Sequence, residues 1–126
     1  MRELTRAEEE VMHVLWKIKK GFVKEILEHF DDPKPAYNTV STIVRILQDK
    51  GFVDHKAYGR THEYFPVVSK DQYSESHLST FVNDYFSNSF GKMVSFFAKE
   101  NRMSVKEMEE IMKTMEYEMK KQKAEK

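Results

Sequence analysis

Hydrophobic positions along the middle of the chain first follow the spacing of a helix and then that of strands. Val40, Ile43, Val44 and Leu47 fall at i, i+3, i+4 and i+7, which places them on one buried stripe of a helix. Gly51 is expected to end that helix. Residues 52–58 and 61–65 are rich in β-branched and aromatic side chains and flank a Gly59-Arg60 turn. The pattern predicts a helix over 36–50 followed by a β-hairpin that Pro66 closes.

The segment before this helix predicts two more helices. Thr5 and Glu8 have the spacing of a capping box, so a first helix is expected from Arg6 to about Lys19, where Gly21 stops it. Its buried positions are expected to be Ala7, Val11, Leu15 and Ile18. A short strand at 22–23 and a second helix over 24–30 follow, before the prolines within 31–35 break the chain.

Three further helices are predicted in the C-terminal half. Ser69 with Gln72 and Ser104 with Glu107 mark two helix starts, and the charged tail over 119–126 is expected to fray. The apolar stripes consist of Leu78, Phe81, Val82 and Tyr85, then Phe90, Met93, Val94 and Phe97, then Met108, Ile111, Met112 and Met115. A segment of about sixty residues rarely buries such broad faces alone, so we expect them to pair two copies of the chain in a homodimer. The alternative is a peptide-binding groove, because methionine-rich surfaces also suit promiscuous binding.

These elements predict a mainly α-helical fold with a small β-hairpin. A helix with a polar face, followed by a hairpin with a basic tip, is the order in which a winged helix-turn-helix presents a recognition helix and a wing to DNA. We therefore expect a winged-helix DNA-binding domain over 1–66 and a helical dimerisation domain over 67–126. The predicted dimerisation residues are Phe81, Tyr85, Phe90, Met93, Val94, Phe97, Met108, Ile111, Met112 and Met115.

Composition narrows the class of protein further. The 126 residues include no cysteine, which excludes disulfide scaffolds, thiolate metal sites and cysteine nucleophiles. No apolar run approaches the roughly 18 residues of a membrane span, and the acidic start of the chain is unlike a secretory signal. We expect a soluble cytoplasmic protein with no membrane insertion. The net charge of zero argues against binding nucleic acid through bulk basicity.

Positive charge is concentrated on the predicted helix and hairpin. Between residues 33 and 62, five lysines and arginines face two aspartates, an excess of three. The polar face of the helix carries Asn38, Ser41, Thr42 and Arg45, which are types that reach base edges or phosphates in a major groove. Arg60 at the hairpin tip can contact a phosphate. The alternatives are that this excess is an ordinary fluctuation and that a charged tip only keeps a turn soluble.

Catalytic and metal-binding patterns are missing from the sequence. The five histidines lack the HExxH or His-x₃-His spacing of a metal site, although His55 and His62 could face each other across the hairpin. There is no phosphate-cradling glycine loop and no GxSxG elbow. We expect neither an enzyme nor a cofactor.

Four stretches resemble the penicillinase and methicillin-resistance repressors, the BlaI/MecI/CopY type of bacterial regulator. They are LTRAEEEVMHVLW from Leu4, YNTVSTIVRILQDKGFV from Tyr37, YGRTHEYFPVVS from Tyr58, and the weaker MVSFFAKENRMSVKEMEEIMKTM from Met93. The resemblance implies a homodimeric winged-helix repressor of a palindromic operator, commonly with TACA and TGTA half-sites. The DNA-binding residues that it implies are Asn38, Thr39, Ser41, Thr42 and Arg45 in the recognition helix and Tyr58, Gly59 and Arg60 in the wing.

The resemblance also implies how repression ends. A membrane metalloprotease sensor leads to a cut in the dimerisation region, which falls here between Phe96 and Phe97. The well-known repressors carry Asn before that Phe, so either a related protease accepts Phe or this chain is not cut. The copper-responsive branch has a cysteine motif that this chain lacks. Two other functions stay open: a ligand-sensing winged-helix regulator of another family, and a winged helix that binds a protein.

Overall fold

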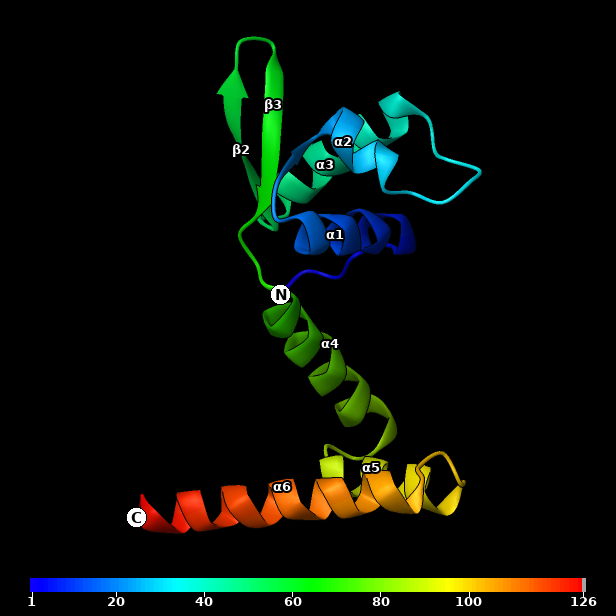
Figure 1. Cartoon of the computed structure of the whole chain (residues 1–126), viewed down its shortest axis with the longest axis vertical. Coiled ribbons are helices and arrows are strands. Elements are labelled where there is room, and N and C mark those ends of the chain that lie inside the picture. The colour runs from blue at the N-terminus through cyan, green and yellow to red at the C-terminus, as the bar shows by residue number, and fades with distance from the viewer. Residues whose placement is uncertain (126) are drawn as a thin grey trace. The chain divides into compact units, whose positions relative to one another are not determined.

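The protein is described by a computed structural model of residues 1–125, which form two compact units (Figure 1). The first unit spans Met1–Leu78 and the second Ser79–Lys126. The elements in chain order are α1 (Arg6–Ile18), β1 (Gly21–Phe22), α2 (Val23–Glu28), α3 (Tyr37–Asp49), β2 (Val53–Tyr58), β3 (Thr61–Pro66), α4 (Lys70–Tyr85), α5 (Phe90–Lys99) and α6 (Val105–Ala124). The boundary expected after Pro66 precedes this division, because Tyr73 of α4 belongs to the core of the first unit.

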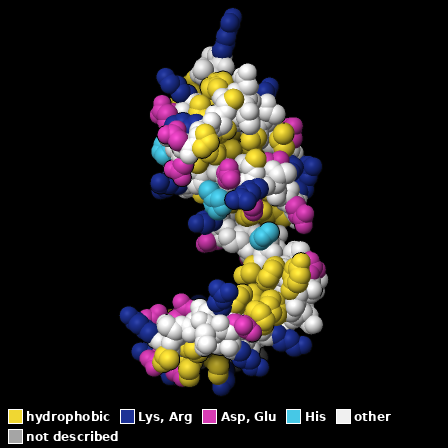
Figure 2. All heavy atoms as spheres, turned by 90° about the vertical axis from the view of Figure 1, so that its right-hand side faces the viewer, with side chains coloured by type: hydrophobic (Ala, Val, Ile, Leu, Met, Phe, Trp, Pro, Cys, Tyr) yellow, Lys and Arg dark blue, Asp and Glu magenta, His cyan; other side chains and the backbone are white. Residues whose placement is uncertain are grey.

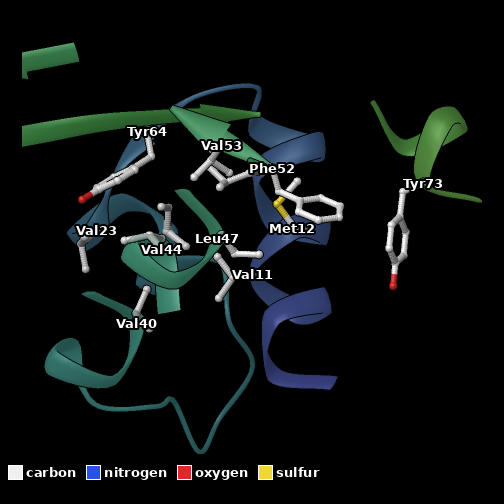
Figure 3. Packing of buried hydrophobic residues seen from close by; sticks show 12 residues of the cluster. Val11, Met12, Val23, Val40, Val44, Leu47, Phe52, Val53, Tyr64 and Tyr73 are labelled. Atoms are coloured by element: carbon white, nitrogen blue, oxygen red, sulfur yellow. The ribbon is translucent and has the colours of Figure 1, made fainter. Parts of the chain in front are cut away.

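The core of the first unit forms where α1, α2 and α3 pack against the small sheet (Figure 3). The stripe predicted for α3 is confirmed, since Val40, Val44 and Leu47 are fully buried and Ile43 is half-buried. In α1 the prediction holds in part. Its buried side chains are Glu8, Val11, Met12 and Leu15, whereas Ile18 is half-buried and Ala7 is exposed.

The predicted end of α1 near Lys19 is confirmed, but the residue expected to stop the helix is wrong. Lys19, not Gly21, terminates the helix, with a left-handed φ of 74° and its N–H donating to the Leu15 carbonyl at 2.7 Å. Gly21 instead begins β1, and a Cβ there would lie 2.9 Å from Ile18 Cδ1. Close approach to Ile18, rather than helix termination, is therefore the local reason for a glycine at this position.

Three antiparallel strands make the sheet, in the order β1-β3-β2. The hairpin is confirmed with a two-residue turn, because Tyr58 pairs with Thr61 across Gly59 and Arg60. The strand expected at 22–23 lies at Gly21–Phe22 and pairs with β3 through Gly21 and Tyr64. This pairing joins the base of the wing to the start of α2.

The second unit contains the end of α4 together with α5 and α6. The helix start at Ser104 is confirmed, since its hydroxyl accepts from the Glu107 N–H at 3.1 Å. The expected fraying from Met119 is wrong up to Ala124, because good helix formers extend α6 and basic residues in its last turn suit the negative end of the helix dipole. Lys126 lies outside the described residues. Figure 2 shows hydrophobic side chains gathered on one side of this unit, within which only Val82 is buried among the described residues.

Candidate nucleic-acid interface

The outer face of α3 carries short polar side chains and one arginine. Burial of the Val40, Val44 and Leu47 stripe fixes the rotation of the helix, so the opposite side must face solvent. Two side chains on this face bond to their own helix: Arg45 Nε donates to the Ser41 carbonyl at 3.2 Å, and Thr42 Oγ1 donates to the Asn38 carbonyl at 2.9 Å. Of the predicted helix residues, Asn38, Thr39, Thr42 and Arg45 are exposed and Ser41 is half-buried.

The wing presents Arg60 at an exposed turn. Gly59 has a φ of +64°, which an L-residue with a side chain adopts only with strain, so the glycine suits this turn. Thr61 Oγ1 donates to the Tyr58 carbonyl at 2.9 Å and closes the turn. The Tyr58 ring lies edge-on to Phe22 of β1, with ring centroids 5.7 Å apart. This contact braces the end of the wing against the body of the unit.

A groove of about 650 Å³ joins α3 to the wing. It brings together Ser41 and Arg45 of α3 with Arg60 of the turn, residues that the sequence proposed separately. Its other lining residues are Phe22, Val23, Lys24, Glu25, Tyr37, Thr61, His62 and Tyr64. Burial raises the pKa of the Tyr64 phenol, and the positive charge of Arg45 partly opposes that rise. Three cations and one carboxylate line the groove, so it suits an anionic ligand such as a phosphate backbone.

Several residues of the groove are marked by no local sequence pattern. Lys24 and Tyr37 reach it only because α2 and α3 pack side by side, so no local pattern marked them. Tyr58 and Gly59, both proposed from the sequence, belong to the wing but not to the groove lining, and Asn38, Thr39 and Thr42 lie on the helix beside it.

Gln48 ties the recognition helix to the wing. Its Oε1 lies 2.7 Å from His55 Nδ1, and the His55 ring stacks on His62 with centroids 4.1 Å apart and planes 7° apart. The two histidines thus lie together as the sequence allowed, but diagonally, because the register pairs His55 with Tyr64 and His62 with Ala57. In the part of the chain that the structure describes, no cluster of three or more histidine or acidic side chains could hold a metal ion.

A recognition-type helix, a wing and a cationic groove between them are the parts of a winged-helix DNA reader, and comparison with known proteins supports that assignment. The family model described as penicillinase repressor matches residues 4–117. The chain belongs to the penicillinase repressor family. Members of this family are DNA-binding transcriptional repressors, not enzymes.

Relatives from staphylococci and bacilli cover most of the chain. The methicillin resistance regulatory protein MecI of Staphylococcus aureus strain N315 is 27% identical over 110 residues, 86% of this chain and 89% of MecI. The penicillinase repressor of Bacillus licheniformis is 27% identical over 115 residues, 90% of each chain.

Solved structures also match. The solution structure of the DNA binding domain of the repressor BlaI is 27% identical, covers 58% of this chain and 94% of that domain, and has a TM-score of 0.49. A chain in the complex structure of hsRosR-S4 shares the fold at a TM-score of 0.52 and 15% identity, over 80% of this chain and 91% of that one.

The residues proposed for dimerisation lie on the helices of the second unit. Met93, Met108 and Ile111 are half-buried, and the other seven, Phe81, Tyr85, Phe90, Val94, Phe97, Met112 and Met115, are exposed in the single chain, from 37% for Phe97 to 73% for Tyr85. Within the described residues, no helix is both long and apolar enough to cross a membrane.

The bond between Phe96 and Phe97 lies inside α5. The Phe96 carbonyl accepts from the Glu100 N–H at 3.0 Å, and the Phe97 carbonyl accepts from the Arg102 N–H, also at 3.0 Å. The bond is therefore part of a hydrogen-bonded helical backbone, with side chains 48% and 37% exposed.

Proposed function

We propose that this repressor binds a palindromic DNA operator as a homodimer in the cytoplasm, and that cleavage in its second unit relieves repression. The groove shared by Arg45 and Arg60 carries the proposal. Arg45 would reach a guanine or a phosphate, Thr42 a thymine methyl or a phosphate, and Arg60 the backbone beside the wing. Asn38, Thr39 and Ser41 complete the reading face, with Tyr58 and Gly59 in the wing.

Two observations support a dimer. The 21 lysines and arginines are balanced by 21 acidic residues, and among the described residues only three cations line the groove, so two DNA-binding units on one duplex would supply the affinity that one lacks. The second unit exposes aromatic and methionine side chains along α4, α5 and α6, and such contiguous apolar surface marks an association site. A second copy of the chain supplies a self-complementary partner for it.

Cleavage between Phe96 and Phe97 would separate the DNA-binding units of the two subunits. A membrane-sensor metalloprotease would trigger it. Proteases bind their substrates in an extended form, so α5 must open locally before the bond can enter an active site. Mass spectrometry after induction should find fragments that end at Phe96 and begin at Phe97. Full-length protein throughout derepression would contradict cleavage.

A gel shift tests DNA binding directly. The probes are the intergenic DNA upstream of the gene and the same fragment with scrambled palindromes, each at two salt concentrations. We expect a retarded band only with the intact palindrome, and weaker binding at higher salt because phosphate contacts release counterions. No retarded band at low salt would contradict operator binding and favour a winged helix that binds a protein.

A further inference from the structure

The connection between the wing and α4 is held along its whole length. The N–H groups of Val67 and Val68 both donate to the Phe52 carbonyl, at 2.9 and 3.4 Å. Trp16 Nε1 donates to the Val68 carbonyl at 2.8 Å. These bonds fix the backbone of the connection to α1 and to the residue that leads into β2, so it does not act as a free hinge.

The first turn of α4 is fixed as firmly. Ser69 and Gln72 form a reciprocal capping box: the Ser69 N–H donates to Gln72 Oε1 at 2.9 Å, and the Gln72 N–H donates to Ser69 Oγ at 3.0 Å. The helix start is therefore defined to the residue, and Tyr73 follows it directly on the same turn.

Tyr73 is the side chain that docks this turn on the first unit. It is 9% exposed, and its ring lies 5.7 Å from that of Phe52 and 5.8 Å from that of Trp16, between centroids. Figure 3 shows the Tyr73 ring, carried by α4, beside the ring of Phe52. Its hydroxyl donates to Glu9 Oε2 of α1 at 2.7 Å. Burial and this bond to the carboxylate both raise the pKa of the phenol, so it stays a donor at neutral pH.

The contacts of Tyr73 connect α4 to the recognition helix. Phe52 follows α3 by three residues, and its N–H donates to the Leu47 carbonyl of α3 at 2.9 Å. A change in the direction of α4 would break the contacts with Phe52, Trp16 and Glu9 together. Side chains that interdigitate in this way resist small rotations.

We propose that Tyr73 is a positioning residue that fixes the direction of the first turns of α4 on the DNA-binding unit and thereby sets the spacing of half-sites that the dimer accepts. The second half of this statement rests on the proposed homodimer. The two DNA-binding units of a dimer reach two half-sites only at a separation that their connections allow. A looser connection should therefore tolerate half-sites at other separations.

The direction of α4 is measured without DNA. The chain has no cysteine, so Lys20→Cys and Glu75→Cys, both exposed, place two spin labels, one on each side of the docked contact. With excess unlabelled protein, pulsed electron paramagnetic resonance should give one narrow distance distribution in the wild type and a broad one in Tyr73→Ala. Equal widths, with the fold retained by circular dichroism, would overturn the proposal. Tyr73→Phe keeps the ring and should broaden the distribution less.

Selectivity for the separation of half-sites is measured on two palindromic duplexes. In the first, the TACA and TGTA half-sites have the separation that the wild type binds most tightly. In the second, that separation is longer by half a turn of DNA. The wild type should prefer the first by about tenfold or more, and Tyr73→Ala should lower that preference to within about threefold. Tyr117→Ala removes an exposed tyrosine from α6 and should leave the preference unchanged.

A Tyr73→Ala protein that binds both duplexes more weakly by the same factor would overturn the role in spacing, because a merely structural residue acts in that way. If the wild type binds neither duplex, the proposed function fails and the role in spacing fails with it. The spin-label distances then decide the docking of α4 separately.

Discussion

At the scale of single residues, Arg45 connects the recognition helix to the groove. Its Nε bonds to the Ser41 carbonyl, which orients the guanidinium along the exposed face. We expect Arg45→Ala to weaken operator binding by about 1–3 kcal/mol, because a bidentate contact is lost. Fluorescence anisotropy on matched and single-base-changed duplexes measures it.

The control for Arg45 is Arg45→Lys, which keeps the charge but not the planar fork. If Arg45 reads a base, lysine should restore little of the specificity; if it holds a phosphate, lysine should restore most of the affinity. Unchanged affinity in Arg45→Ala would remove the residue from the reading face.

Glu8 provides a residue-scale test of stability. Burial raises the pKa of this carboxyl, but hydrogen bonds and charge from Lys50 and the bonds with Thr5 outweigh burial and hold the pKa below 4.5. Lys50 Nζ lies 2.6 Å from Glu8 Oε1, and the side chains are 15% and 7% exposed. A depressed pKa means that the folded state favours the carboxylate, so its contribution is present above about pH 4.5 and is lost as the pH falls through the folded pKa.

Glu8→Gln should remove that dependence while keeping the acceptor for the Thr5 N–H. We expect the variant to be less stable than the wild type near neutral pH, by about 2 kcal/mol or more, because the largely buried Lys50 loses its charged partner and keeps only neutral acceptors such as the Glu3 carbonyl. The difference in free energy of unfolding, from urea titrations, should shrink as the pH falls below about 4.5. A constant difference across this range would contradict the assignment.

At the scale of elements, the sequence predicts where two helices start but not the backbone conformation that ends α1. The capping boxes at Thr5 and Ser69 depend on side chains three residues apart, so their spacing predicted both helix starts. The position where α1 ends was predicted, but the left-handed φ of Lys19 that ends it was not, because lysine is uncommon in this conformation. The pairing of β1 with β3 joins distant segments and was predicted only as a short strand.

Two substitutions test the residues that follow α1 and α3, both of which have a positive φ. Lys19→Gly should stabilise the protein by up to about 1 kcal/mol, because glycine adopts a φ of 74° without the Cβ strain. Gly51→Ala should destabilise it by about 1 kcal/mol, since Gly51 has a φ of +83° and an added Cβ would meet no atom within 4 Å, leaving only backbone strain. Thermal unfolding measures both. A shift of the same sign in both variants would contradict the account.

The sequence likewise indicates only part of the candidate site. The polar face of α3 and the Gly59-Arg60 turn lie within continuous segments, so the sequence indicated both. The groove that joins them also needs Phe22 and Lys24, which tertiary packing supplies. The part-buried Tyr73–Glu9 bond joins residues 64 positions apart, and no periodicity could have marked it.

At the scale of the whole molecule, the exposed apolar side chains of the second unit should hold two chains together. Phe97→Asp and Met112→Asp each place a carboxylate in the proposed interface, which costs several kcal/mol when it is buried without a partner. We expect monomers by analytical ultracentrifugation at concentrations where the wild type is dimeric. Val105→Asp, at an exposed apolar position outside the proposed set, is the matched control. Dimers in both test variants would show that another surface pairs the chains.

The short polar face of α3 limits the length of DNA sequence that one subunit can recognise. A four-base half-site recurs by chance about once in 250 base pairs, whereas two such half-sites at a fixed separation recur about once in 65,000. Side chains as small as Asn38, Thr39 and Thr42 therefore identify a promoter only as members of a pair. Separation of the two subunits would leave each DNA-binding unit able to bind at many sites in the genome. The selectivity for one promoter would then be lost, even though each unit still binds DNA.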